Sequence, residues 1–310
     1  MSRLSEAAAD YLELRNRLGH DLAEHHRLLP RFVAYLDEIA APTVTIAAAL
    51  DWAFAPGIDA ASSNPARRMT IARRFAQHMA GLDPRTEIPP PGLISFPQRW
   101  HPPFIFTRAD LDTLTIQAQC RVRGRLPAAT HSTMLGLLGA TGLRVGEAIR
   151  LDCTDIDWTA EALLIRESKF GKSRLVPVLP STLAALRDYA DIRDEHHPAP
   201  TTASFFVSRR GNRMVYPCVQ EIFRNLCRAT GIGADADRQP RIHDLRHSFA
   251  VNTLLRWHRA GEDVDAKLPT LSTYLGHRDP RSTYWYLSAA PEQLNLAAQR
   301  LEYSIQARPS

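Results

Sequence analysis

A dense run of prolines interrupts this chain and limits what it can fold into. Seven of its 22 prolines lie between residues 83 and 103, namely Pro84, Pro89, Pro90, Pro91, Pro97, Pro102 and Pro103. Proline lacks a backbone N–H and clashes with the preceding helical turn, so neither a helix nor a central strand can run through such a segment. With 310 residues, the chain can bury a core on each side of it. We therefore expect two domains, residues 1–83 and 104–310, joined by a linker over 84–103.

Both sides of the proline run are predicted to be mainly helical. In the first, apolar residues recur at spacings near three and four, as in Leu28, Leu29, Phe32, Val33 and Leu36, which is the period of a helix that buries one face. The second opens with an N-cap signal at Thr107. The exception is 162–179, where β-branched arms flank a basic turn and predict a β-hairpin. The expected fold class is mainly α with a small β-hairpin or sheet (α+β).

The composition excludes few classes of function but favours some binding partners over others. No apolar run approaches the roughly 20 residues that span a bilayer, and the first residues do not resemble a secretory signal. We therefore expect a cytoplasmic protein with no membrane partner. The four cysteines show no metal-ligand spacing, so no metal site is predicted. The net charge of +5 and pI near 9.2 favour a polyanionic partner such as nucleic acid.

Three short motifs carry residues suited to chemistry at a phosphate. The first, residues 141–147, places Arg144 directly before an apolar helix, and the second, residues 241–249, sets His243 and Arg246 three apart on one helical face. The third, residues 274–277, ends in His277 and is followed nine residues later by Tyr286. Each motif alone is also explained by a solvated charge or a packed ring. Their order within one domain is hard to obtain by chance.

Together the motifs resemble the tyrosine recombinase (phage integrase) family. The resemblance implies a helical N-terminal core-binding domain over 1–83 and a catalytic domain over 104–310 with a C-terminal helix after the nucleophile. It also assigns the site residues. Arg144 matches the first arginine, His243 and Arg246 the HxxR pair, His277 the position of a histidine or tryptophan, and Tyr286 the nucleophile. Lys169 matches the lysine of the β-hairpin turn.

Lysine is rare here, and this supports the assignment of the hairpin. The chain has 38 lysines and arginines but only three lysines, Lys169, Lys172 and Lys267, and two of these fall in the hairpin turn. A lysine can release a proton near neutral pH whereas an arginine cannot. We expect Lys169 to be a general acid, with Lys172 as its rival or as a DNA phosphate contact. Tyr284 lies two residues before Tyr286 and is a second possible nucleophile by type, although the spacing favours Tyr286.

A second basic cluster lies in the first domain. Arg67 and Arg74 are seven apart and share one helical face, with Arg68 and Arg73 beside them. A DNA backbone can bind along such a face. A solvated helix surface explains the same pattern almost as well.

The resemblance implies a site-specific recombinase or integrase that breaks and rejoins DNA strands through a 3′-phosphotyrosine, without metal, nucleotide or other cofactor. The implied partners are double-stranded DNA carrying specific recombination sites and further copies of the chain, as a tetramer on DNA, alone or with related recombinases. The helix expected after Tyr286 can dock on a neighbouring copy or on its own domain. The alternatives are relaxation of DNA in the manner of a type IB topoisomerase and a catalytically idle DNA-binding accessory protein.

Overall fold

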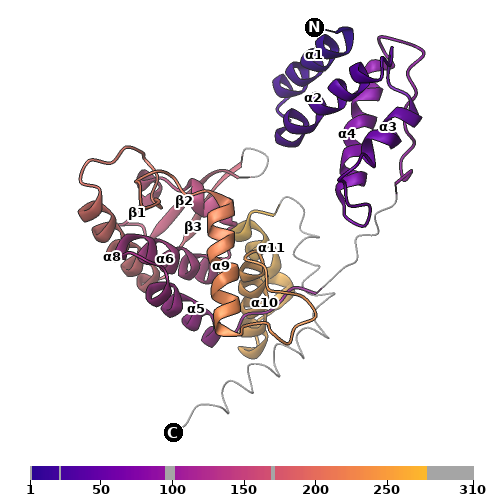
Figure 1. The fold of residues 1–310 in the computed structure, drawn as a ribbon. Coiled ribbons are helices and arrows are strands. Elements are labelled where there is room, and N and C mark those ends of the chain that lie inside the picture. Colours follow the sequence, from indigo (N-terminus) through magenta and orange to yellow (C-terminus); the bar gives the residue numbers. More distant parts are fainter. Residues whose placement is uncertain (1, 21, 95–101, 169–171, 278–310) are drawn as a thin grey trace. The chain divides into compact units, whose positions relative to one another are not determined.

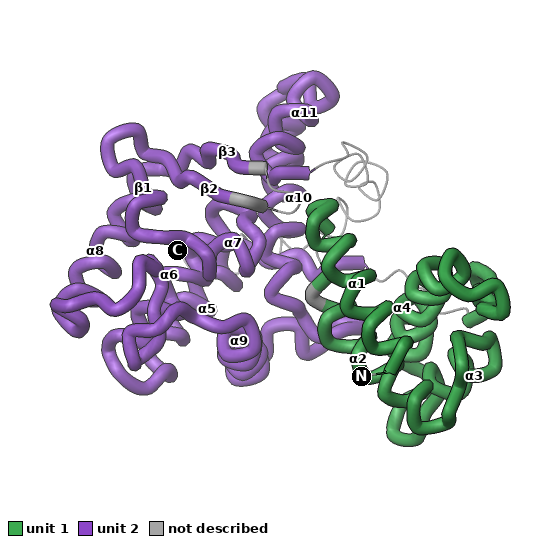
Figure 2. The backbone as a smooth tube through the Cα atoms, turned by 90° about the horizontal axis from the view of Figure 1, so that it is seen from above, with its two compact units in different colours: residues 1–100 green, residues 101–310 purple. Residues whose placement is uncertain are grey.

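The computed structural model describes residues 2–20, 22–94, 102–168 and 172–277. It divides the chain into two compact units, Met1–Trp100 and His101–Ser310 (Figure 2). The prediction of a mainly helical chain with a small β-sheet is confirmed (Figure 1). Within the described residues, no helix is both long and apolar enough to cross a membrane.

The described residues of unit 1 form four helices: α1 (Arg3–Arg17), α2 (Ala23–Glu38), α3 (Ile46–Ala53) and α4 (Asn64–Met79). Side-chain oxygens cap two of them, because the Ser5 amide donates to Ser2 Oγ and the Ala48 amide to Thr45 Oγ1, at 3.1 and 3.2 Å. Such caps satisfy amides that have no partner within the helix. The apolar faces meet in one core that includes Phe32, Trp52 and Phe75.

The first part of the proline-rich segment is hydrogen-bonded to the helical part of unit 1. The Glu87 amide donates to the Val44 carbonyl at 2.9 Å, and the Glu87 carboxylate accepts from the Ile46 amide at 2.8 Å. Arg73 of α4 donates to the carbonyls of Pro89 and Pro90 at 2.8 and 2.9 Å. Residues 87–90 are therefore held against α4 and the segment that leads into α3.

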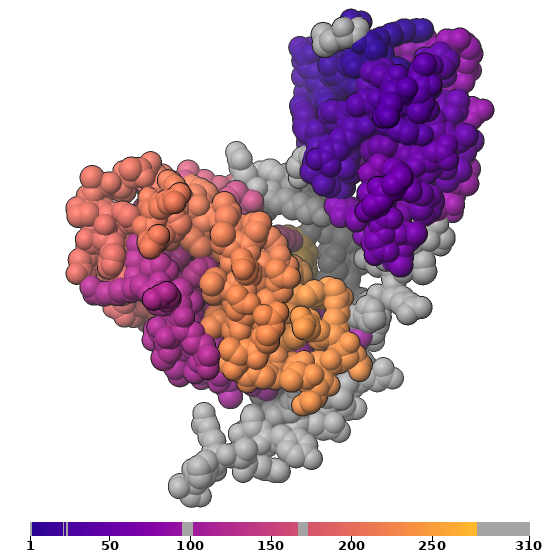
Figure 3. Space-filling view, viewed as in Figure 1, coloured from indigo at the N-terminus to yellow at the C-terminus, as the bar shows by residue number. Residues whose placement is uncertain are grey.

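Unit 2 contains the helices and strands that carry the predicted catalytic motifs. In chain order its elements are α5 (Arg108–Arg121), α6 (Arg125–Thr141), α7 (Val145–Arg150), a 3-10 turn (Cys153–Asp155), β1 (Ile156–Asp157), β2 (Ala162–Ser168), β3 (Lys172–Pro177), α8 (Pro180–His196), α9 (Tyr216–Thr230), α10 (Asp244–Arg259) and α11 (Val264–Leu275). Thr107 caps α5 as predicted, in a capping box with Asp110. Helix α6 packs against α5, α8 and α10, and α9 crosses part of the face of unit 2 that is turned to the viewer in Figures 1 and 3.

The three strands form an antiparallel sheet in the order β1-β2-β3. In the β2–β3 pair, Leu163 lies opposite Val176 and Ile165 opposite Arg174, and the register shifts before Ser168 pairs with Lys172. Side chains alternate between the two faces of a strand. Val176 is fully buried and Leu175 is 66% exposed, so Arg174 shares the inward face of β3 with Val176.

Candidate active site

Arg144 stands where α6 ends and α7 begins. Gly142 ends α6 in the left-handed conformation, with φ of +62°, and a Cβ there would lie 2.6 Å from a ring carbon of Phe249. Only glycine fits both the backbone angle and the space. The tight turn puts Arg144 at the N-cap of α7, where its amide and its Nη1 donate to the two carboxylate oxygens of Glu147 at 2.9 and 2.8 Å.

Glu147 joins two arginines in the interior. Its side chain is 1% exposed, and it accepts two further hydrogen bonds from Arg174 of β3, at 3.1 and 3.0 Å. Burial by itself would raise the pKa of Glu147. The hydrogen bonds and charges of Arg174 and Arg144 outweigh burial and lower the pKa to about 2. The carboxylate is therefore ionised at neutral pH and holds both guanidinium groups.

Arg246 reaches the same place from α10. It is 2% exposed and lies in the first turn of the helix, one turn after His243 at the N-cap. Its Nη1 donates to the Gly142 carbonyl at 2.8 Å and its Nη2 to the Leu275 carbonyl at 2.7 Å. These bonds orient the guanidinium and compensate for the cost of burying its charge.

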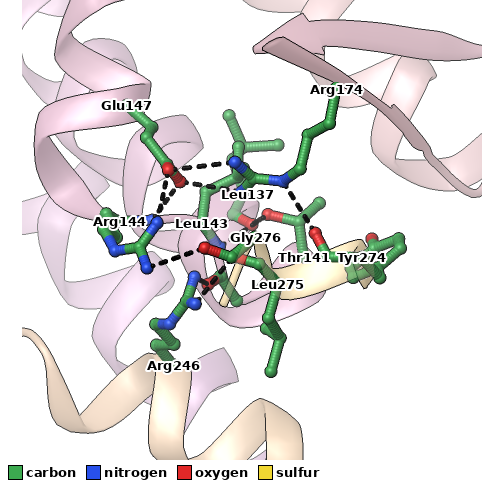
Figure 4. Close-up of polar contacts among 11 residues, drawn as sticks. Leu137, Thr141, Leu143, Arg144, Glu147, Arg174, Arg246, Tyr274, Leu275 and Gly276 are labelled. Carbon is green, nitrogen blue, oxygen red and sulfur yellow. Dashed lines mark hydrogen bonds and ion pairs between the residues drawn. The ribbon is translucent and has the colours of Figure 1, made fainter. Parts of the chain in front are cut away.

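The C-terminal end of α11 accepts a hydrogen bond from three different arginines (Figure 4). The last carbonyls of a helix have no partner inside it and carry its partial negative charge. Here three consecutive carbonyls take these donors. Tyr274 accepts from Arg174 Nε at 2.8 Å, Leu275 from Arg246 at 2.7 Å and Gly276 from Arg144 Nη2 at 3.1 Å. The end of α11 therefore gathers three cations, from the N-cap of α7, from α10 and from β3.

His243 and His277 border these cations. His277 follows Gly276 directly. Burial, followed by the charges of Arg246 and Arg144, lowers the pKa of His277 to about 4. Partial burial and the Arg246 charge likewise lower the pKa of His243. Both rings are therefore neutral at pH 7.

The structure brings together four of the residues singled out from the sequence. Arg144, His243, Arg246 and His277 come from three separate segments and meet around the end of α11. Lys169, Tyr284 and Tyr286 lie outside the described residues. Lys172 is the first residue of β3, and its side chain is also outside the described part of the structure.

The four arginines predicted to contact DNA in unit 1 all lie on α4 but have different surroundings. Arg67 forms an ion pair with Glu24 at 2.5 Å, Arg68 lies 3.9 Å above the centre of the Trp52 ring, and Arg73 donates to the two proline carbonyls described above. Arg74 is exposed. The first three arginines thus have partners within unit 1, and Arg74 is, with Arg67, one of the two exposed members of the group.

Sequence reasoning assigned no role to Glu147, Arg174 or His247. His247 packs edge-on against His243, with ring centres 4.9 Å apart, and burial lowers its pKa to about 3. A signal was present for Glu147, which is three residues after an N-cap, the position of a capping-box acid. Nothing local marked Arg174, because alternation with an apolar neighbour on a strand does not say which of the two side chains faces inward.

The described residues contain no group of three or more His, Cys, Asp or Glu side chains placed to hold a metal ion. The polar groups that meet at the end of α11 are instead mostly cationic or neutral donors. Such a set suits an anion with several oxygens, because arginine offers paired donors to phosphate.

Comparison with known proteins decides the family. The model of the phage integrase family matches residues 115–293. The integrase/recombinase y4rB of Sinorhizobium fredii is 42% identical over 308 residues, which is 97% of this chain and 98% of that protein. The chain belongs to the phage integrase family. It is therefore a DNA strand transferase of site-specific recombination, as the sequence predicted.

Solved structures agree with this assignment at the level of the fold. The Tn1549 transposon integrase in complex with transposon right end DNA has a TM-score of 0.62 and 17% identity, over 95% of this chain and 99% of that chain. The XerH recombinase in a post-cleavage complex with its difH substrate has a TM-score of 0.60 and 17% identity, over 82% of this chain and 70% of that one.

Proposed function

We propose that this protein cuts and rejoins double-stranded DNA at specific sites by transferring a DNA 3′-phosphate to Tyr286. The observation that supports this most directly is the convergence of Arg144, Arg246, His243 and His277 on the end of α11. A phosphodiester that enters there meets two fixed guanidinium groups. Donors that are already oriented stabilise the charge of a phosphorane without having to reorganise.

Each residue then has one task. Tyr286 Oη attacks phosphorus while the bond from phosphorus to the 5′-oxygen breaks. Neutral His243 accepts the phenol proton, since a phenol of pKa about 10 is protonated at pH 7. Lys169 protonates the departing 5′-oxygen, and Arg144, Arg246 and His277 donate to the non-bridging oxygens. The reverse step, with the 5′-hydroxyl of another strand, seals the exchanged DNA.

The positive charge in this scheme comes from the chain itself. We therefore propose that neither a metal ion nor ATP is needed, and that Lys172 and the arginines of α4, chiefly Arg74, contact DNA phosphates outside the reaction centre. Residues 1–83 act as the core-binding domain, 84–103 as the linker and 104–310 as the catalytic domain. Four protomers assemble on two duplexes in the cytoplasm, because each exchanged strand requires its own nucleophile.

Selection from a pool of randomised duplexes tests the proposal and finds the target sequence. The wild-type protein is incubated with the pool in excess EDTA, denatured, and the DNA that stays attached is sequenced. We expect an attached, enriched sequence, loss of attachment for Tyr286→Phe and retention for Tyr284→Phe. Attachment by Tyr286→Phe would show that the nucleophile is misassigned, and attachment only after adding a divalent ion would support a metal-dependent mechanism.

A further inference from the structure

Arg174 joins three elements of unit 2 through one side chain. It extends from β3, donates Nη1 and Nη2 to the two oxygens of Glu147 on α7, and donates Nε to the Tyr274 carbonyl at the end of α11, all at 2.8–3.1 Å. Its side chain is 11% exposed. A planar guanidinium with paired donors suits this task, and lysine cannot reproduce the geometry.

The surroundings of Arg174 are built closely around it. A Cβ on Gly276 would lie 2.6 Å from Arg174 Nη1 and 2.8 Å from Cζ, so the backbone at the end of α11 passes directly over the guanidinium. An arginine on the inward face of a strand also loses most of its hydration, which destabilises the fold unless its donors find acceptors. Two of the three acceptors are the oxygens of Glu147, which also contacts Arg144, and the third is the carbonyl of Tyr274, three residues before His277.

Loss of Arg174 would weaken the site by removing these hydrogen bonds. Glu147 would keep Arg144 as its cation but would lose two hydrogen bonds, and the Tyr274 carbonyl would lose its donor. Arg144 also donates to the Gly276 carbonyl, two residues after the Tyr274 carbonyl that accepts from Arg174. Both acceptors of the Arg144 guanidinium, Glu147 and Gly276, therefore lie in segments that Arg174 holds. An error of about 1 Å in a group that orients a substrate can slow a reaction about 100-fold.

We propose that Arg174 is a positioning residue for strand transfer: it fixes Glu147 and the end of α11 relative to β3, and thereby sets where Arg144 and His277 meet the scissile phosphate. This inference rests on the proposed function. Arg174 itself does not touch the phosphate in this scheme. It acts on the reaction through Glu147, Arg144 and the backbone that leads to His277.

The test compares Arg174→Met with a matched control in the same hairpin. Arg166 on β2 forms an ion pair with Asp155, whose side chain is 3% exposed, and donates to Thr154 Oγ1 at 3.1 Å. Arg166→Met therefore also removes an arginine from a buried carboxylate, but away from the end of α11. The probe is a nicked duplex carrying the sequence that the wild-type protein selects, and single-turnover attachment to Tyr286, DNA affinity and unfolding are measured for each full-length variant.

We expect Arg174→Met to slow attachment about 100-fold while DNA affinity changes little, and Arg166→Met to react nearly as fast as the wild type. Because Arg174 acts through Glu147, combining Arg174→Met with Glu147→Gln should slow the reaction much less than the product of the two single effects. If Arg174→Met does not fold, Arg174→Lys keeps a charge beside Glu147 and should still be slow.

Attachment by Arg174→Lys or Arg174→Met at the wild-type rate, or multiplicative effects with Glu147→Gln, would overturn the positioning role while leaving the proposed function intact. Equal slowing by Arg166→Met would reduce Arg174 to a general stabiliser of the hairpin. Failure of the wild-type protein itself to attach to any duplex would instead reject the proposed function.

Discussion

Replacing Gly276 by alanine tests whether α11 must approach Arg174 as closely as the structure shows. Gly276 is the left-handed C-cap of α11, with φ of +69°, and an added Cβ would meet the Arg174 guanidinium at 2.6 Å. Gly231 is a matched control. It caps α9 with φ of +71°, and a Cβ there would meet nothing within 4 Å.

Both variants lose stability because alanine disfavours a left-handed backbone, and only Gly276→Ala also introduces a close contact. A left-handed backbone disfavours alanine by about 1 kcal/mol once the stiffer unfolded chain is included. At Gly276 the contact of 2.6 Å is also about 0.8 Å shorter than an ordinary contact of 3.4 Å. A shift of that size breaks at least one of the 3.0 and 3.1 Å bonds from Arg174 to Glu147. A lost hydrogen bond to a charged group costs about 1.5–3 kcal/mol.

We therefore expect Gly276→Ala to lower the free energy of unfolding of unit 2 by about 3 kcal/mol and Gly231→Ala by about 1 kcal/mol. A chain with two units need not unfold in a single step. Urea unfolding should therefore be followed by pulsed hydrogen exchange in peptides from α6, which report on unit 2 alone. If Gly276→Ala loses no more stability than Gly231→Ala, the close approach of α11 to Arg174 is refuted.

Three further outcomes are expected. Burial lowers the pKa of His131 from 6.5 to about 4, so the unfolded chain binds a proton at a higher pH than the folded chain does. At pH 5 this lowers the free energy of unfolding by about 2 kcal/mol. His131→Leu should therefore reduce the difference in unfolding free energy between pH 7 and pH 5 by that amount. Lys169→Ala should slow cleavage steeply, and a DNA substrate with sulfur as the bridging 5′ atom should restore the rate, because sulfur leaves without a proton. If this substrate rescues Lys172→Ala and not Lys169→Ala, Lys172 is the general acid. Arg74→Ala should reduce the salt dependence of DNA binding by about one phosphate contact, whereas Arg73→Ala should mainly destabilise unit 1, as measured by urea unfolding.

The sequence was sufficient to find the site residues that belong to short motifs in a fixed order. Arg144, His243, Arg246 and His277 each belong to a short motif, and the structure places all four around one helix end. The fold class was also predictable, because helical periodicity and a β-branched hairpin are local patterns.

The supporting contacts could not be predicted in the same way, because they join distant segments. Arg174 is 27 residues from Glu147 and 100 residues from Tyr274 in the chain, and nothing local distinguishes it from the other arginines. The surroundings of the arginines on α4 also depend on tertiary packing. Arg68 covers the Trp52 ring and Arg73 holds two proline carbonyls, which the spacing of basic residues along a helix does not reveal.

The acceptors at the end of α11 are backbone atoms, and this affects how the site can vary and how it can be studied. The carbonyls of Tyr274, Leu275 and Gly276 accept from three arginines, yet changing the side chain of residue 274 or 275 leaves those carbonyls in place. Alanine scanning would miss them. Replacing the following amide by an ester, which weakens the carbonyl as an acceptor, would detect each contact separately. Related proteins can therefore change the sequence of α11 and keep the same anchor, provided that its last turn and its glycine are preserved.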